Sequence, residues 1–364
     1  MKILYITNGI HGAGGLERVL SIKAGYLADK LDHEVHILTL NAKGAPVFYE
    51  FSPKIHFHDI IAGGNPITYT REYVNGIREV VNKVRPQIIS VCDDGLKGFF
   101  LPKVLPKTYP IIYERHVSKI IELGAFPSTI RKLKVRFKFF LMNLLAKNFD
   151  RFVVLTRDNI SEWNLKNIIV ISNPLSFNPS DSSPLNHNKV IAVGKQSHQK
   201  GFDLLLQSWV AVQEKHPDWK LEIYGKFEPS LGLEALARKL GVQETVTFFP
   251  PEKAIMEKYL QSDVFALSSR FEGFGMVLTE AMICGVPCVS FDCPCGPRDI
   301  IMDGEDGFLV ENGDTEKFGE RILDLIENPQ LRLAMGGKAK ENVKRYLPET
   351  IVAQWDELFK SLAR

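Results

Sequence analysis

Short apolar runs alternate with helical patterns along the whole chain. In the first half, runs rich in β-branched residues cover positions 2–7, 34–40, 88–92, 110–114 and 151–155. Helical patterns lie between several of these runs, for example at 16–31 and 70–84. Strands that are apolar throughout and are joined by helices are typical of a parallel sheet with helices on both faces. The first half therefore predicts a doubly wound α/β domain.

The same alternation restarts after a segment rich in Asn, Pro and Ser at 173–188. Strands are expected at 189–193, 220–224, 245–249, 263–267 and 287–291. Helices are expected at 201–216, 231–240, 252–261, 276–284, 315–327, 330–345 and 348–363. We therefore predict two doubly wound domains joined by the Asn/Pro/Ser-rich segment. Because ligands of such sheets bind at the carboxyl ends of the strands, we expect a cleft between the domains.

Composition narrows the class of function. With 364 residues, 45% hydrophobic and 24% charged, the chain has the make-up of a globular protein of two-domain size. A net charge of +2 does not favour a nucleic-acid partner, so any basic patch must be local. The N-terminus lacks the features of a signal peptide, and no run approaches the length of a membrane span, about 18 apolar residues. These features predict a cytoplasmic protein.

Four of the five cysteines lie close together, at Cys284, Cys288, Cys293 and Cys295. Their spacing lacks the Cys-x-x-Cys pairs usual for zinc, and no histidine lies nearby. Cysteine on an apolar strand or a helix end behaves as a small hydrophobic residue. We therefore expect reduced, structural thiols rather than a metal site.

A pair of glutamates brackets two glycines near the start of a predicted helix. Glu272-Gly273-Phe274-Gly275 precedes an apolar run that contains Glu280. Free backbone N–H groups and the positive dipole end of that helix would form an anion site, which the glycines would let a phosphate approach closely. Carboxylates on either side would bind the hydroxyls of a polyol attached to the phosphate. The pattern indicates a nucleotide-sugar pocket, and a loop with a charged cap is the alternative interpretation.

Two further glycine-rich loops each follow a strand and precede a helix. Gly12-Ala13-Gly14-Gly15 lacks the G-x-G-x-x-G spacing, and no acidic residue ends the second strand, so we do not expect a dinucleotide dehydrogenase. The loop from Gly194 to Gly201 carries Lys195 and Lys200, which can converge on one diphosphate. A loop that only needs positive φ, and lysines that only face solvent, remain the alternatives.

Taken together, these residues make the chain similar to the retaining glycosyltransferases of family 4, of the bacterial surface-polysaccharide type. The resemblance covers essentially the whole chain and is densest between 190 and 310. Its most specific part is the E-x7-E spacing from Glu272 to Glu280, with a Glu-Gly-Phe-Gly start. The other matching segments are Asn173-Pro174, Gly285–Ser290, Gly296–Ile301 and Asp303–Val310.

The resemblance implies the GT-B fold, in which two Rossmann-like, doubly wound parallel-sheet domains face a central cleft. It implies an N-terminal acceptor-binding domain at 1–172 and a C-terminal nucleotide-sugar-binding domain at 173–345. The C-terminal helix at 346–364 is expected to return to the N-terminal domain.

The resemblance also implies roles for individual residues. Glu272 would bind the hydroxyls of the donor sugar, and Glu280 would bind the ribose. Lys200 matches the family's phosphate-binding lysine, whereas Lys195 stands where the family usually has arginine, so bidentate geometry would be lost there. The base is expected near Phe249 and Pro250. The other residues expected at the donor are Gly14, Gly15, Gly194, Gly273, Phe274, Gly275 and Met276.

His116 follows the first-domain strand at 111–114 and matches a histidine that the family places near the acceptor and the donor sugar; a structural role is the alternative. In the mechanism drawn for the family, the leaving phosphate oxygen takes the acceptor proton and the anomeric configuration is retained. Lys195, Lys200 and the helix dipole would stabilise the developing diphosphate charge. The catalytic candidates are thus Glu272, His116 and the two lysines. The chain contains no Asp-x-Asp, and we expect neither a bound metal nor a cofactor, because the nucleotide-sugar is a substrate.

Residues 129–149 form a basic amphipathic pattern. Its apolar residues are Ile130, Leu133, Phe137, Phe140, Leu141, Leu144 and Leu145, and its cations are Arg131, Lys132, Lys134, Arg136 and Lys138. Such a helix can lie on an anionic membrane surface, here the inner face of the cytoplasmic membrane, which would suit a lipid-linked acceptor. A domain helix with a buried apolar side and a solvated charged side is the alternative.

The sequence thus predicts a transferase that moves a hexose or N-acetylhexosamine from a nucleotide-sugar to a glycan or lipid-linked acceptor in cell-surface polysaccharide synthesis. The resemblance of Asp292–Pro297 to transferases of UDP-sugars favours a UDP-linked donor, and GDP-mannose remains open. A nucleotide-sugar 2-epimerase would need acidic and basic cleft residues that we do not identify. Nothing in the sequence favours a non-catalytic binding protein.

Overall fold

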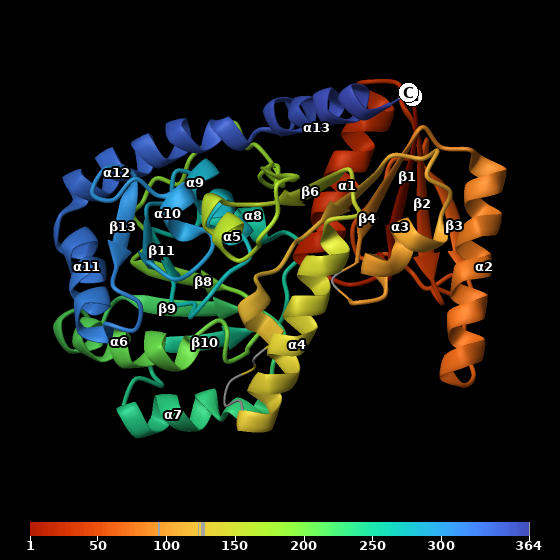
Figure 1. The fold of residues 1–364 in the computed structure, drawn as a ribbon. Coiled ribbons are helices and arrows are strands. Elements are labelled where there is room, and N and C mark those ends of the chain that lie inside the picture. Colours follow the sequence, from red (N-terminus) through yellow and green to blue (C-terminus); the bar gives the residue numbers. More distant parts are fainter. Residues whose placement is uncertain (94, 123, 125–127, 364) are drawn as a thin grey trace. The chain divides into compact units, whose positions relative to one another are not determined.

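The computed structural model describes residues 1–93, 95–122, 124 and 128–363. The chain divides into two compact units. The first unit comprises Met1–Ser176 and the segment that begins at Pro348, and the second unit is Phe177–Leu347. Each unit contains one parallel sheet with helices packed against it (Figure 1).

The sheet of the first unit has seven strands in the order β3-β2-β1-β4-β5-β6-β7, and all neighbouring strands are parallel. The strands are β1 (Lys2–Thr7), β2 (Glu34–Leu40), β3 (His56–Ile60), β4 (Ile88–Cys92), β5 (Ile111–Glu114), β6 (Arg151–Val154) and β7 (Ile168–Val170). The helices are α1 (Gly15–Asp29), α2 (Pro66–Val84), α3 (Leu101–Val104), α4 (Thr129–Ala146), α5 (Arg157–Ser161) and α13 (Pro348–Leu362). Two 3-10 turns occupy Gly98–Phe100 and Lys119–Glu122.

The central strands of this sheet are buried along almost their whole length, because helices cover them. Every residue of β4 and β5 is buried, as continuous apolar runs in a parallel sheet require. Aromatic side chains fill one side of the core, where Tyr113 and Phe152 stack at 5.1 Å and Phe99 stacks on Trp163 at 6.0 Å.

The last helix of the chain packs on α1 of the first unit, beside which it lies in Figure 1. Trp355 and Phe359 on α13 are buried. Nε2 of His33, just after α1, lies 2.7 Å from Oδ1 of Asp356. The end of the chain is therefore a structural part of the first unit.

The sheet of the second unit has six parallel strands in the order β10-β9-β8-β11-β12-β13. The strands are β8 (Lys189–Val193), β9 (Lys220–Tyr224), β10 (Val246–Phe249), β11 (Val264–Leu267), β12 (Cys288–Phe291) and β13 (Gly307–Val310). The helices are α6 (Phe202–Lys215), α7 (Leu233–Leu240), α8 (Ile255–Leu260), α9 (Met276–Ile283), α10 (Pro297–Ile300), α11 (Thr315–Glu327) and α12 (Pro329–Asn342). The core holds Trp209, whose indole N–H donates to Thr245 Oγ1 at 3.0 Å.

The structure differs from the sequence prediction mainly at the edges of the sheets. β3, β7 and β13 were not expected as strands. Each is an edge strand, which pairs with a neighbour on one side only. The predicted helix at 129–149 ends at Ala146, and the one at 330–345 ends at Asn342 before a 3-10 turn. In the described part of the chain, no helix combines the length and the apolar character that crossing a membrane requires.

Candidate functional site

The loop between β8 and α6 closes tightly around the side chain of Lys200. A Cβ atom on Gly194 would lie 2.8 Å from the Lys200 side chain. Gly201, the N-cap of α6, has φ of 61°, and a Cβ atom there would lie 2.1 Å from the backbone oxygen of Ser268. Only glycine fits this position without a backbone shift. The two glycines therefore fix the path of Lys200.

Lys200 and Glu272 form an ion pair at the carboxyl end of the second sheet. Lys200 Nζ lies 2.7 Å from Glu272 Oε1, and the two side chains are only 16% and 6% exposed. The hydroxyl of Ser269 donates to the same carboxylate oxygen at 2.6 Å. The loops meet because β8 and β11, which precede them, are neighbours in the sheet. Two signals that the sequence showed separately thus come together as one charged pair.

Further hydrogen bonds hold the two loops together. The Arg270 guanidinium binds both carboxylate oxygens of Asp203, at 2.8 and 2.6 Å, and also donates to the backbone oxygen of His198. Ser268 Oγ donates to the backbone oxygen of Lys200 at 2.9 Å. Burial would raise the pKa of Asp203, but the bonds from Arg270 outweigh it and lower that pKa. Sequence analysis did not single out these residues, and the signal available was the polar run at 268–270 after an apolar strand.

Helix α9 begins at Met276, shortly after Glu272 in the sequence, and its first turn has backbone N–H groups without partners inside the helix. Gly275 is the N-cap, with φ of 93°, no side chain caps the helix, and its first turn has no acidic residue. Gly296 lies so close that a Cβ atom on it would be 2.0 Å from the backbone oxygen of Phe274. Phe274 itself is buried and packs edge-on against the ring of Tyr346 at 5.4 Å. The uncompensated positive end of α9 begins at Met276, as the sequence predicted.

Glu280 lies inside α9, more than one turn after the helix begins at Met276. It is 2% exposed, and the Tyr259 hydroxyl donates to its Oε2 at 3.3 Å. Burial, together with the charge of Glu280, raises the pKa of the Cys284 thiol to about 12. All five cysteines are buried free thiols. The four clustered cysteines therefore pack as small apolar residues.

The residues expected at the base lie at the carboxyl end of the edge strand β10. Phe249 stacks on Tyr224, which ends the neighbouring β9, at 4.7 Å and an interplanar angle of 14°. Pro250 is exposed, and so is Lys195, one residue beyond Gly194. Gly225 donates its N–H to the backbone oxygen of Phe249 at 3.0 Å. The ends of β8, β9 and β10 thus place the lysine loop and an aromatic pair at the same edge of the sheet.

The glycine loop of the first unit is open by comparison. Gly14 is the N-cap of α1, and Gly12, Gly14 and Gly15 are exposed. A Cβ atom on Gly12 or Gly14 would meet only the Glu17 side chain closely, with a carboxylate oxygen at 2.5 Å. Both ring nitrogens of His11 are shielded from solvent and lack a hydrogen-bond partner among the described residues. An acidic group therefore lies beside the loop where the sequence predicted a diphosphate.

His116 follows β5 in the first unit and lies 3.2 Å, through Nε2, from Oε2 of Glu114. The ligand atoms of Cys92, Glu114 and His116 lie within 4.8 Å of one another, which is close enough for a shared metal ion. Lys23 Nζ is bonded to the same Oε2 of Glu114, however. A divalent cation there would face an ammonium group, and we assign no metal to this cluster.

Helix α4 presents an apolar stripe to solvent. Ile130, Leu133, Phe137, Phe140 and Leu144 are between 51% and 70% exposed, whereas Val135, Met142 and Leu145 are buried. The segment contains no Asp or Glu. Arg131, Lys132, Lys134 and Arg136 are exposed, and Lys138 is partly buried. The alternative in which the apolar side of this helix is core is wrong for these five apolar residues.

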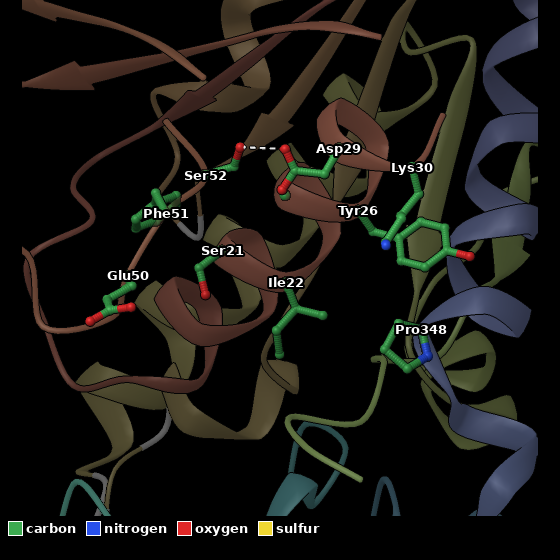
Figure 2. Close-up of a pocket in the computed structure, with 10 residues that line it drawn as sticks. Ser21, Ile22, Tyr26, Asp29, Lys30, Glu50, Phe51, Ser52 and Pro348 are labelled. Carbon is green, nitrogen blue, oxygen red and sulfur yellow. Dashed lines mark hydrogen bonds between the residues drawn. The ribbon is translucent and has the colours of Figure 1, made fainter. Parts of the chain in front are cut away.

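A hollow of about 420 Å³ lies on the first unit, along α1 (Figure 2). Tyr26, Phe51 and Pro348 line it, and Asp29 there accepts a hydrogen bond from Ser52 at 2.7 Å. None of the residues predicted for the site lies in its lining. It is separate from the loops described above.

The known sequences that this chain resembles include several glycosyltransferases. Residues 177–342 match the family described as glycosyl transferases group 1. The chain is 32% identical to the amylovoran biosynthesis glycosyltransferase AmsD of Erwinia amylovora, over 98% of this chain and 99% of that protein. It is 28% identical to an uncharacterized glycosyltransferase of Haemophilus influenzae, over 97% and 98% of the two chains.

Solved structures share the fold. Sucrose-phosphate synthase from Thermosynechococcus elongatus superposes with a TM-score of 0.84 at 18% identity, over 100% of this chain and 99% of that one. TarM of Staphylococcus aureus, in a complex containing UDP, gives a TM-score of 0.79 at 16% identity, over 99% and 100% of the two chains. The prediction of a GT-B fold with two Rossmann-like parallel-sheet domains is confirmed.

Proposed function

This chain belongs to the group 1 glycosyltransferases, and on that premise we propose that it transfers a hexose or N-acetylhexosamine from a UDP-linked donor. The acceptor is a glycan or a lipid-linked glycan in the synthesis of a cell-surface polysaccharide. Transfer proceeds with retention at the anomeric carbon and without a bound metal. The observation that carries the proposal is the largely buried Lys200–Glu272 pair, which glycines hold at the carboxyl end of the second sheet, next in sequence to the start of α9.

The ion pair supports a donor site because each partner has a use for a sugar diphosphate. Lys200 neutralises Glu272 at 2.7 Å. A diphosphate at the α9 N-terminus would compete for the Lys200 ammonium, and the released carboxylate would accept bonds from sugar hydroxyls. Donor binding thus exchanges one charged pair for two charge-assisted contacts. Burial of the pair strengthens both, because the local dielectric is low.

The same groups would stabilise the transition state. As the bond between the anomeric carbon and the diphosphate breaks, negative charge grows on the leaving oxygen. Lys200, the exposed Lys195 and the backbone N–H groups at Met276 would face that charge, and one such donor is worth about 10²- to 10³-fold in rate. The acceptor oxygen bonds to the anomeric carbon on the face that the diphosphate leaves, so the configuration is retained, and the leaving phosphate oxygen takes the proton of the acceptor hydroxyl. Glu280 would bind the ribose, and Phe249 would border the base.

Two relatives support the acceptor class. One is named for amylovoran biosynthesis, and another is a poly(ribitol-phosphate) α-N-acetylglucosaminyltransferase of Staphylococcus aureus, 28% identical over 70% of this chain and 50% of that protein. Two structural neighbours were solved with UDP. We carry the UDP donor and the polysaccharide acceptor over to this chain as part of the proposal.

Incubation with a panel of UDP- and GDP-sugars tests this reaction. Nucleotide release without acceptor, transfer to a lipid-linked or glycan acceptor, and the anomeric configuration of the product can be followed by proton NMR. Turnover of a UDP-hexose or UDP-N-acetylhexosamine with retention is expected. Turnover of GDP-mannose alone would overturn the donor assignment, and epimerised donor without transfer would overturn the transferase.

We further propose that α4 docks the protein on an anionic membrane surface that carries the acceptor. Five exposed apolar side chains recur at helical spacing along α4, and five Lys or Arg side chains accompany them without a single acid. This combination fits the interface of an anionic bilayer, where each basic residue contributes about 1 kcal/mol. Such docking would place the protein at the inner face of the cytoplasmic membrane.

Vesicle co-sedimentation tests the docking. Binding to vesicles with 30% phosphatidylglycerol is expected, with little binding to phosphatidylcholine alone. Phe137→Ser combined with Phe140→Ser should weaken binding at least tenfold, because both side chains are more than 60% exposed. Ile67→Ser is the matched control, since Ile67 is 82% exposed on α2. Equal binding by the double variant and the wild type would refute the docking surface.

A further inference from the structure

A buried charge network lies behind His116. Lys23 lies on α1 and is 1% exposed, and its ammonium is bonded to the carboxylate of Glu114 at the end of β5, which is also 1% exposed. Ser90 Oγ on β4 donates to Oε1 of that carboxylate at 2.5 Å. Nε2 of His116 lies 3.2 Å from Oε2. One carboxylate therefore joins α1, β4 and the segment that carries His116.

The C-terminal helix completes the network. Lys23 Nζ lies 3.9 Å from the ring centroid of Trp355 on α13 and 5.0 Å from that of Tyr5 on β1. Both rings are buried, so the ammonium is enclosed by aromatic faces and one carboxylate. The last helix of the chain thus covers the cation that holds Glu114 in place.

Stability alone gives a weak reason for this arrangement. A buried ion pair loses the hydration of both charges, and a well-packed apolar pair of similar volume is often as stable or more so. The pair does, however, keep Glu114 ionised. Burial would raise the pKa of Glu114, but the Lys23 charge and the His116 bond outweigh it and lower that pKa to about 2. An ionised carboxylate can only accept hydrogen bonds.

The state of the imidazole follows from this. Because Glu114 only accepts, the proton shared with His116 belongs to Nε2, and Nδ1 is then the nitrogen with the free lone pair when the ring is neutral. A neutral acid at position 114 would remove this constraint, and the ring could adopt either tautomer. The network therefore has a chemical consequence that packing alone would not have.

We propose that Lys23 and Glu114 are positioning residues that fix the ring orientation and the Nε2–H tautomer of His116, with Trp355 of α13 enclosing the lysine. The proposal deepens the proposed function: His116 matters for transfer if it lies near the acceptor and the donor sugar, as the family resemblance implies. The effect of the network on the tautomer does not rest on it.

Three variants separate positioning from folding. Glu114→Gln keeps the shape but can both donate and accept. Lys23→Met leaves the Glu114 charge without its partner, so this variant can fail to fold. The double variant Lys23→Met with Glu114→Gln removes both charges, and we expect it to fold with a melting temperature close to that of the wild type.

The first readout is the ¹⁵N spectrum of histidine-labelled protein, with His116 assigned by its loss in His116→Gln. The wild type should show a single Nε2–H form of the neutral ring. Glu114→Gln and the double variant should show a mixture of tautomers. An unchanged Nε2–H form in the double variant would overturn the proposal.

The second readout is transfer by the folded full-length protein. In the double variant, kcat should fall at least 30-fold while the donor KM stays within threefold, because the Lys200–Glu272 pair proposed to bind the donor lies in the other unit. Trp355→Leu should lower kcat less, about fivefold, whereas the neighbouring Asp356→Asn, which contacts His33 instead, should leave it unchanged. Wild-type kcat in the folded double variant would overturn the proposal. A wild type that transfers no sugar would refute the proposed function. The tautomer measurement would still show whether Lys23 and Glu114 fix the Nε2–H form of His116.

Discussion

The two glycine-rich loops of the molecule follow the same kind of strand and open the same kind of helix, yet they are built differently. In the second unit, Gly194 and Gly201 are hemmed in by the Lys200 side chain and by the backbone at Ser268. In the first unit, the glycines at 12, 14 and 15 are exposed, and the close neighbour of two of them is the flexible carboxylate of Glu17.

The difference shows which loop is organised in advance for a ligand. The second loop presents an ammonium at a fixed place, paired with a carboxylate that a diphosphate would displace from it. The first presents backbone in an open conformation with an acidic side chain beside it. Preorganised charge stabilises a transition state more than groups that must move. We therefore expect groups of the second unit to contribute most of the electrostatic stabilisation of the transition state.

Among the substitutions in the two loops, Gly201→Ala should destabilise the protein most. Its φ of 61° is unfavourable for alanine, and its Cβ atom would lie 2.1 Å from a backbone oxygen. A loss of about 3 kcal/mol or more in the unfolding free energy is expected by urea titration. Gly232→Ala is the matched control, because Gly232 has the same φ of 61° but nothing within 4 Å, and should lose only about 1 kcal/mol. Equal losses would mean that backbone crowding at Gly201 is unimportant.

Lys200→Met should nearly abolish transfer. The variant keeps the apolar stem that packs against Gly194 and removes the charge expected to face the diphosphate. We expect kcat/KM to fall at least 100-fold in a steady-state assay with a saturating acceptor. Lys215→Met at the end of α6 is the control, because the Lys215 side chain is 60% exposed. If Lys200→Met lowers kcat/KM by less than tenfold, a group other than Lys200 must stabilise the charge on the diphosphate.

Gly14→Ala should have the smallest effect. Gly14 has φ of −82°, which alanine adopts freely, and the nearby Glu17 carboxylate can move aside. Stability should stay within about 0.5 kcal/mol of the wild type. If the diphosphate approaches this loop, kcat/KM should fall about tenfold, whereas Gly9→Ala, with nothing within 4 Å, should not change it. A loss comparable to that of Lys200→Met would reverse the ranking of the two loops.

The sequence predicted buried elements better than edge elements. The strand at 88–92 is apolar at every position but Ser90, is buried along its whole length and lies in the middle of its sheet. β3 reads His-Phe-His-Asp-Ile and pairs with a neighbour on one side only, so its polar positions hide the strand pattern. β7 reads Ile-Ile-Val and has no polar position, but at three residues it is too short to show a strand pattern.

The site was predictable as a set of residues but not as a set of contacts. The glycine and lysine spacing indicated an anion loop, and the glutamate pair indicated a sugar site. That Lys200 binds Glu272, 72 positions later, depends on β8 and β11 being neighbours, which no local pattern records. Lys23 reads as an ordinary helix lysine, and its pairing with Glu114, 91 positions away, appears only when α1 is placed on the sheet.

Titration of UDP into the wild type and into Glu272→Ala, with transfer assayed on the same samples, tests the central assignment most directly. Removing Glu272 frees Lys200 from its 2.7 Å partner, so UDP affinity should equal or exceed that of the wild type. Transfer should fall at least 1,000-fold, because the sugar loses the carboxylate that orients it, as loss of aligned contacts does elsewhere by about 10²-fold or more. Loss of UDP affinity in Glu272→Ala, or transfer that persists, would contradict the division of the site into a phosphate-binding lysine and a sugar-binding glutamate.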